Sequence, residues 1–73
     1  MSDASQAVGA RIKAARESRE LTQDQLARKL GVTWVTISRW ERGINPPPVN
    51  RLRVLAQVLG VSSGDLLDGK VAA

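Results

Sequence analysis

The segment of residues 22–43, TQDQLARKLGVTWVTISRWERG, constrains the fold of this chain more than any other. It opens with a capping box, in which the Thr22 hydroxyl accepts the backbone N–H of Gln25 and the Gln25 side chain reaches back. Gly31 then stands where the end of a helix favours a left-handed residue. These signals predict a helix over about 23–30 that is followed at once by a tight turn.

A second short helix is predicted directly after this turn. Thr33 suits its N-cap, and Gly43 suits its C-terminal end. Ile37 and Trp40 lie three residues apart, on what becomes its inner face. We therefore expect a helix over about Thr33–Arg42, held at a fixed angle to the first. Two helices joined in this way form a helix-turn-helix, whose second helix is shaped to enter the major groove of DNA.

Helical patterns also flank this central segment. Val8, Ile12 and Ala15 recur at the i, i+4, i+7 spacing of one helix face, which predicts a helix over about Gln6–Arg19. Nothing in the sequence has the alternating pattern of a strand. The sequence thus predicts an all-α fold of five short helices around one small core. We expect residues 1–73 to form a single domain with an ordered core over about 6–68.

The C-terminal part is predicted to hold two of these helices. Proline is tolerated in the first turn of a helix but not in its interior, so the fourth helix is expected to begin at Pro48, the last of three prolines. Gly60 ends it, and Ser62 caps a fifth helix, after which residues 70–73 should fray. The apolar positions expected on these two helices are Val49, Leu52, Leu55, Ala56, Leu59, Leu66 and Leu67.

Composition excludes several classes of protein. The chain contains no cysteine and no histidine, so it offers no disulfide framework, zinc finger or imidazole-based catalysis. No apolar run approaches the roughly 20 residues of a membrane helix, and the N-terminal residues lack the apolar core of a secretory signal. A cytoplasmic protein without membrane contact is expected. No metal constellation, nucleophile–base pair or phosphate loop is present, so we expect neither a cofactor nor enzymatic activity.

The charge is concentrated in the middle of the chain. Between Arg11 and Arg53 there are ten basic and four acidic residues, a balance of +6 within a net charge of +4. A basic centre with mildly acidic ends is typical of a protein that binds nucleic-acid phosphates. A solvated surface that happens to be rich in arginine remains the alternative explanation.

The outward face of the second motif helix separates these two explanations. With Ile37 and Trp40 inward, a step of about 100° per residue turns small, β-branched and arginine side chains outward, with no acid among them. Arg39 suits a bidentate contact to guanine O6 and N7, and Val35 suits a thymine methyl. The predicted base contacts are Trp34, Val35, Ser38 and Arg39. The predicted phosphate contacts are Gln23, Thr33, Thr36 and Arg42.

The motif closely resembles the Xre/Cro-type helix-turn-helix of bacterial and phage repressors. Thr-Gln, Leu-Ala, Gly-Val and Ile-Ser-Arg-Trp-Glu-Arg-Gly match in order and spacing, and the resemblance spans about Val8–Leu67. It implies a compact five-helix, lambda-repressor-like domain that binds double-stranded DNA. It also implies base reading by Trp34, Val35 and Arg39, and phosphate contacts by Gln23, Thr33 and Arg42. Finally, it implies a buried salt bridge between Arg16 and Glu41, which join the first and third helices.

Trp34 departs from the resemblance, because relatives usually carry a small or polar residue at this position. Its direction is intermediate, about 60–80° from the buried side of the helix. Two interpretations stay open: the indole lies back over the second helix as partial core, or it meets thymine methyls or sugars in the groove. Trp40, by contrast, points inward and is expected in the core.

Two functions from different classes fit these observations. The first is a sequence-specific transcriptional regulator, a repressor that binds a palindromic operator as a homodimer through its third helix. A dimer is expected because one small module makes few contacts with DNA by itself. The interface between the two copies is expected within residues 55–71. The second is a protein-interaction module of the same fold, such as the antitoxin of a toxin–antitoxin pair. Its exposed apolar candidates are Leu66, Leu67, Val71 and Trp34.

Overall fold

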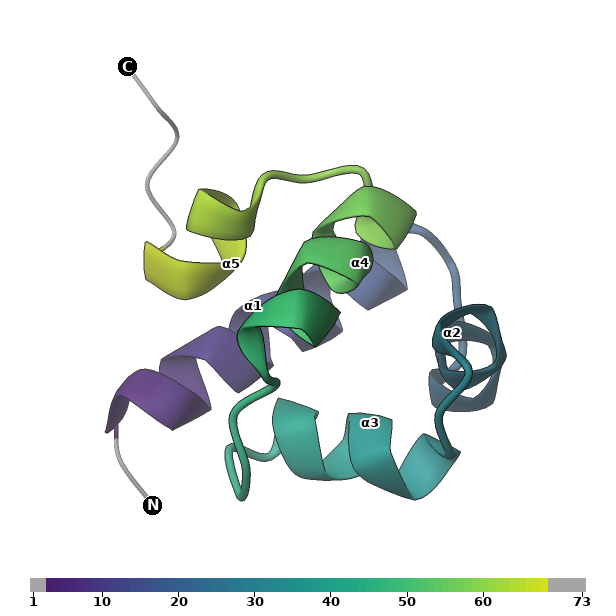
Figure 1. Cartoon of the computed structure of the whole chain (residues 1–73), viewed down its shortest axis with the longest axis horizontal. Coiled ribbons are helices and arrows are strands. Elements are labelled where there is room, and N and C mark those ends of the chain that lie inside the picture. Colours follow the sequence, from purple (N-terminus) through teal and green to yellow (C-terminus); the bar gives the residue numbers. More distant parts are fainter. Residues whose placement is uncertain (1–2, 69–73) are drawn as a thin grey trace.

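Five helices form residues 3–68, the part of the chain that the computed structural model describes (Figure 1). They are α1 (Asp3–Ser18), α2 (Gln23–Leu30), α3 (Trp34–Glu41), α4 (Val49–Leu59) and α5 (Ser63–Asp68). The expected all-α class is confirmed, and no strand occurs within this range. None of these helices combines the length and apolar character that crossing a membrane requires.

Local capping sets the ends of α2 where the sequence predicts them. The Thr22 hydroxyl accepts Gln25 N–H at 3.0 Å, and Thr22 N–H donates to Gln25 Oε1 at 2.8 Å. Gly31 adopts the left-handed conformation with φ 72°, and Val32 N–H donates to the carbonyl of Ala27 at 3.0 Å. Glycine adopts this conformation without steric penalty, so the chain turns sharply from α2 into α3.

One core joins all five helices. Its fully buried large side chains come from α1, α2, α3, α4 and α5 and are Ile12, Leu26, Ile37, Leu55, Leu59 and Leu66. The backbones of α1 and α3 approach closely at Gly9, where an added Cβ would lie 2.5 Å from the carbonyl oxygen of Glu41. This crossing holds α3 at one edge of the molecule (the bottom of Figure 1), where it packs against both α1 and α2.

The bounds of α1 differ from the prediction. The helix begins at Asp3 rather than near Gln6, and it ends at Ser18 rather than Arg19. The apolar spacing that gave the prediction marks only the buried part of a helix, whereas the first turn of α1 continues beyond the core with an exposed Ala4. Glu20 has a positive φ of 57°, and this left-handed residue directs the chain toward α2.

Two apolar residues of α4 and α5 lie outside the core. Val49 is 71% exposed although it is in register with the buried face of α4, because it begins the helix and no other element within residues 3–68 covers that end. Leu67 is 54% exposed, so it lies outside the core and stays a candidate for contact with another molecule, whereas Leu66 beside it is buried and is wrong as an exposed candidate. Val71 and the expected fraying of residues 70–73 lie outside the described residues. The Ser62 cap of α5 is present, because Ser62 Oγ accepts Asp65 N–H at 3.0 Å.

Candidate nucleic-acid interface

α3 has two sides of opposite character. Its inner side packs against α1 and α2 and buries Ile37, Trp40 and Glu41. Thr33 is its N-cap, as predicted, and Gly43 adopts φ 74° directly after the helix. The outer side is therefore turned away from the rest of the molecule (Figure 1).

The outer side carries most of the predicted base contacts. Trp34 is 55% exposed and Val35 is 36% exposed. Arg39 and Arg42 are also exposed, whereas Ser38 and Thr36 are half-buried. The structure thus presents a tryptophan, a valine and arginine side chains on one side of a short helix, with no acidic residue in its first turn.

The predicted phosphate contacts are engaged to different extents. The Thr33 hydroxyl accepts Thr36 N–H at 3.4 Å and lies 3.2 Å from the Thr36 hydroxyl. Both threonines are therefore oriented by the N-terminal cap of α3, where backbone N–H groups favour an anion. Arg42 follows at the opposite end of the helix and is exposed.

Arg16 and Glu41 form an ion pair between α1 and α3. Arg16 Nε donates to Glu41 Oε2 at 2.6 Å, and Arg16 Nη2 donates to Glu41 Oε1 at 3.1 Å. Arg16 Nη1 also donates to the carbonyl of Leu21 at 2.7 Å. The hydrogen bond to Glu41 raises the pKa of Arg16 against the opposing effect of burial. The fork of the guanidinium thus satisfies a buried carboxylate and fixes the angle between two helices.

Gln23 joins this ion pair, which the sequence does not predict. Its Nε2 donates to Glu41 Oε1 at 3.0 Å, so the first residue of α2 is tied to the last residue of α3. Sequence patterns place Gln23 at the start of a helix and Glu41 near an inner face. They carry no signal for a contact between side chains that belong to different helices.

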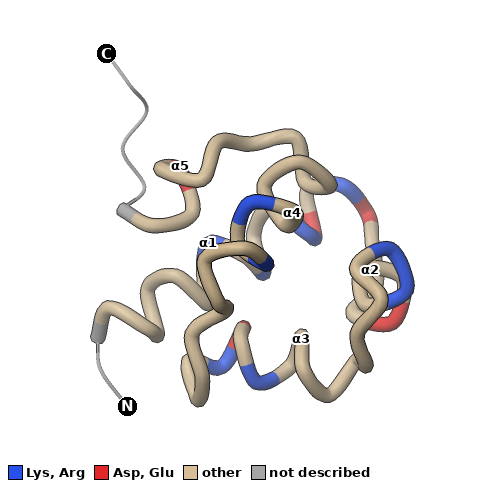
Figure 2. The backbone as a smooth tube through the Cα atoms, in the orientation of Figure 1, with Lys and Arg blue, Asp and Glu red and all other residues tan. Residues whose placement is uncertain are grey.

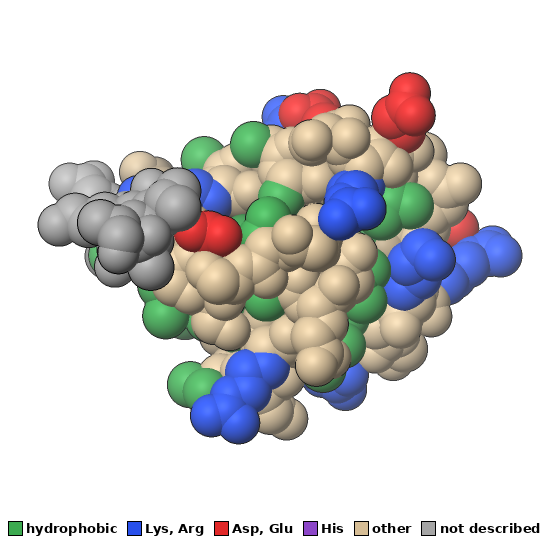
Figure 3. All heavy atoms as spheres, turned by 90° about the horizontal axis from the view of Figure 1, so that it is seen from above, with side chains coloured by type: hydrophobic (Ala, Val, Ile, Leu, Met, Phe, Trp, Pro, Cys, Tyr) green, Lys and Arg blue, Asp and Glu red, His purple; other side chains and the backbone are tan. Residues whose placement is uncertain are grey.

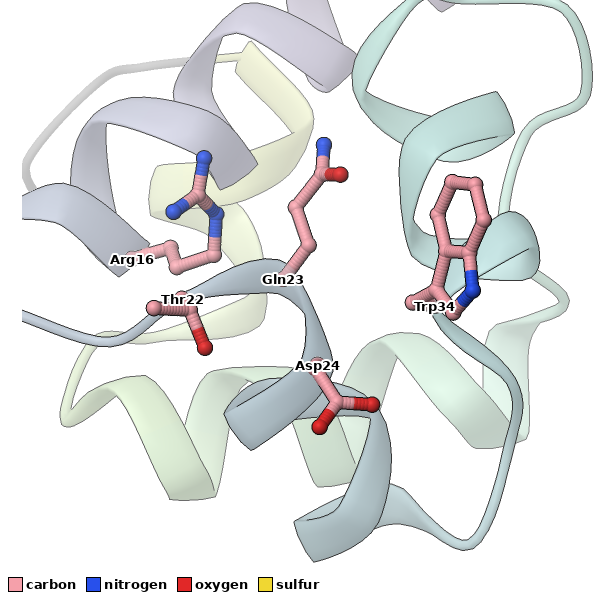
Figure 4. A pocket seen from close by; sticks show the side chains of 5 residues that line it. All are labelled: Arg16, Thr22, Gln23, Asp24 and Trp34. Carbon is pink, nitrogen blue, oxygen red and sulfur yellow. The ribbon is translucent and has the colours of Figure 1, made fainter.

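A cleft of about 380 Å³ lies beside this network and is lined by Arg16, Thr22, Gln23, Asp24 and Trp34 (Figure 4). The Gln23 side chain extends into the space between Arg16 and Trp34. The indole of Trp34 therefore stands over the start of α2 while more than half of it remains exposed. The indole thus lies beside α2, as one interpretation of this residue held, but it is not fully buried, and contact with DNA stays a prediction.

Several arginines have a structural role that the sequence did not reveal. Arg19 Nε donates to the carbonyl of Leu59 at 3.0 Å, and Arg51 Nη1 donates to the carbonyl of Leu30 at 2.9 Å. Arg11 Nη1 donates to the carbonyl of Leu67 at 2.8 Å. These three side chains satisfy carbonyls at the C-terminal ends of α4, α2 and α5, which their own helices leave unbonded.

The basic residues are accordingly spread over α1 to α4 (Figure 2). On the side opposite α3, positive side chains stand in separate groups among uncharged and acidic ones (Figure 3). Arg28 is paired with Asp24 at 2.9 Å on the exposed surface of α2. Among residues 3–68, five exposed cations form neither an ion pair with a carboxylate nor a side-chain hydrogen bond to a helix end. They are Lys13, Lys29, Arg39, Arg42 and Arg53.

Comparison with known proteins places this geometry in a family. The helix-turn-helix family model matches residues 12–66. The transcriptional regulator DicA of Escherichia coli is 37% identical over 62 residues, which cover 85% of this chain and 46% of DicA. The transcriptional activator BcrR of Enterococcus faecalis is 33% identical over 60 residues, which cover 82% of this chain and 29% of BcrR. The chain thus spans less than half the length of either relative.

A solved structure shows the same arrangement of helices. The c2 repressor of Salmonella phage P22, crystallised in complex with a synthetic operator, superposes with a TM-score of 0.84 at 37% identity. The match covers 89% of this chain and 98% of that structure's chain. These relatives are named as regulators of transcription and not as enzymes. From the matched motif, the five-helix fold and these relatives, the chain belongs to the Xre/Cro-type helix-turn-helix family.

Proposed function

We propose that this chain is a sequence-specific DNA-binding regulator of transcription that inserts α3 into the major groove. The observation that carries the proposal is the exposed outer side of α3, which combines apolar and arginine side chains while its inner side is fixed in the core. A groove-binding helix needs this combination of a rigid mount and a free face. The complex of the related P22 c2 repressor with a synthetic operator supports it.

Base reading is assigned to the outer side of α3. Arg39 is exposed in the last turn of α3 and can donate two parallel hydrogen bonds to guanine O6 and N7. Val35 and the exposed indole of Trp34 offer apolar contact to thymine methyls or to sugars. Ser38 is half-buried, so it reaches a base only where the helix lies deep in the groove.

Phosphate binding is assigned to the two helix starts and to Arg42. Gln23 begins α2, and Thr33 and Thr36 lie at the cap of α3, where N–H groups point outward. Each neutralised phosphate contributes about −0.9 to the slope of log K against log salt. Since three arginines are engaged by helix ends and Arg39 is assigned to base reading, we expect the other four exposed cations to give a slope of about −3.6 or shallower per protomer.

A homodimer on a palindromic operator completes the proposal. One module of this size makes few base contacts, and two copies bound about 34 Å apart would place both α3 helices on one face of the duplex. Occupation of the operator would then repress transcription. A reporter gene placed behind the selected site should lose expression when the protein is present.

The test is a selection of bound DNA from a random pool at two salt concentrations. Wild-type protein should enrich one symmetric site, with half-sites about one helical turn apart. Arg39→Ala should lose preference at one base pair of each half-site. The matched variant Arg42→Ala should weaken all sequences about equally and make the salt slope shallower by about one. A pool that shows no enrichment with wild-type protein would overturn the proposal and favour a protein-interaction module.

A further inference from the structure

Glu41 connects three helices through one carboxylate. Its Oε2 accepts Arg16 Nε at 2.6 Å, whereas its Oε1 accepts both Arg16 Nη2 at 3.1 Å and Gln23 Nε2 at 3.0 Å. The side chain of Glu41 is only 2% exposed and that of Arg16 is 10% exposed. The carboxylate is therefore held in one position, because Arg16 of α1 donates to both of its oxygens and solvent hardly reaches it.

This contact fixes the orientation of the Gln23 amide. A carboxylate can only accept hydrogen bonds, so the NH₂ group of Gln23 must face Glu41 and its carbonyl must face away. The NH₂ group has two N–H donors, and Glu41 uses one of them. The amide extends into the cleft between Arg16 and Trp34, where its second N–H can meet a ligand (Figure 4).

Charge balance makes this end of α2 suitable for an anion. A lone carboxylate would repel a phosphate, but the guanidinium of Arg16 neutralises Glu41 with two hydrogen bonds. The start of α2 adds the partial positive charge of unbonded backbone N–H groups. Asp24 also lines the cleft, and its carboxylate is paired with Arg28 at 2.9 Å on the exposed surface. With both carboxylates paired to arginines, Gln23 presents a donor beside a positive helix end.

We infer that Glu41 is a positioning residue for DNA binding, which holds the Gln23 amide so that its second N–H donates to a phosphate of the DNA backbone. The inference rests on the proposed function. A glutamine that must be ordered during binding loses rotamer freedom, and this loss reduces affinity. Glu41 removes this penalty in advance. The ion pair of Arg16 and Glu41 therefore acts on DNA affinity as well as on the fold.

A double-mutant cycle on the selected DNA site tests the inference. Gln23→Met keeps the length of the side chain and removes its donors, so in the wild-type background it should lower affinity about tenfold. In the Glu41→Gln background the same change should lower affinity less than about threefold, because the amide there is no longer held by a charged acceptor. Gln57→Met, at an exposed position of α4, is the matched control and should leave affinity unchanged. Equal losses in both backgrounds would overturn the inference.

A second measurement needs no variant and applies even where Glu41→Gln fails to fold. In the free wild-type protein, the side-chain amide protons of Gln23 should exchange with water more slowly than those of Gln57, as seen by NMR. Exchange as fast as that of Gln57 would overturn the inference. If wild-type protein binds no DNA, the proposed function fails together with the inference. If it binds and the cycle shows equal losses, only the inference fails.

Discussion

The two sides of α3 are under different constraints: the inner side must pack in the core, whereas the outer side is exposed. On the inner side, Ile37 is fully buried and Trp40 is 5% exposed, so packing against α1 and α2 sets their size and shape. On the outer side, Trp34 is 55% exposed and Arg39 is exposed, so the fold places little demand on either. Substitutions on the inner side should therefore change stability, whereas those on the outer side should change DNA recognition and leave stability nearly constant.

Glu41→Ala on the inner side is one of the two substitutions with the largest expected effect. It leaves the guanidinium of Arg16 buried without its carboxylate, and it also removes the hydrogen-bond partner of Gln23. We expect a loss of about 3–5 kcal/mol in the free energy of unfolding. Urea denaturation followed by circular dichroism measures this loss, and a value below about 1 kcal/mol would show that the ion pair does not support α3.

Gly9→Ala should disturb the inner side from α1. The new methyl group would lie 2.5 Å from the carbonyl oxygen of Glu41, and a backbone atom cannot move aside without shifting α3. Overpacking of this kind lowers the free energy of unfolding by about 1–3 kcal/mol. Gly64→Ala in α5 is the matched control, because its methyl group would approach only Ser62 Oγ, at 3.8 Å. Equal thermal melting of the two variants would contradict a tight crossing of α1 and α3.

Arg39→Ala tests whether the outer side of α3 reads bases. We expect a loss of about 1–3 kcal/mol in discrimination at one base pair, because the bidentate donor to guanine disappears. The free energy of unfolding should stay within about 0.5 kcal/mol of wild type, since the side chain is exposed. Competition binding with single-base variants of the site measures the first quantity and urea denaturation the second. Unchanged discrimination would remove Arg39 from base reading.

The two tryptophans provide a comparison within one residue type. Trp40→Ala should lower the free energy of unfolding by about 3–5 kcal/mol, because it empties a core position, whereas Trp34→Ala should lower it by less than about 1 kcal/mol. Thermal melts of both variants measure the difference. A large loss for Trp34→Ala would show that the indole supports the start of α2.

The smallest expected effect is that of alkaline pH on the ion pair. The pKa of Arg16 is raised in the folded state, so the stability it contributes is present below its ordinary pKa and is lost only as pH rises through the raised value. Between pH 7 and about 10.5 this contribution should stay constant. Arg16→Lys should begin to lose this contribution once pH rises above about 10.4, the ordinary pKa of lysine, which lies well below that of arginine. Urea denaturation of wild type and Arg16→Lys at neutral and alkaline pH measures the free energy of unfolding of each protein. An equal loss in both proteins at alkaline pH would contradict the role given to the Arg16 charge.

Sequence patterns predict the parts of the fold that local chemistry determines. The bounds of α2 follow from the Thr22 capping box and from Gly31, whose hydrogen bonds form within a few residues. The side of α3 that faces the core follows from the spacing of Ile37 and Trp40. Periodicity could not show that Val49 and Leu67 are exposed among the described residues, because exposure depends on where the other helices end.

In the candidate interface, too, the sequence predicts what depends on one helix and does not predict what depends on contacts between helices. The exposure of Arg39 and Val35 follows from their place on an amphipathic helix. The hydrogen bond of Gln23 to Glu41 could not be foreseen, because it depends on how α2 and α3 cross. Likewise, Arg19 and Arg51 donate hydrogen bonds to the last carbonyls of other helices. A count of basic residues in the sequence therefore overstates the number of positive side chains that are free to contact DNA.

The two indole N–H resonances test the central claim most directly. The chain has two tryptophans and no other aromatic residue, one on the outer side of α3 and one on its inner side. When the selected DNA site is added to ¹⁵N-labelled protein, the indole resonance of Trp34 should shift strongly and that of Trp40 should stay nearly in place. A Trp34 resonance that does not move while the protein is bound would contradict the insertion of α3 into the groove.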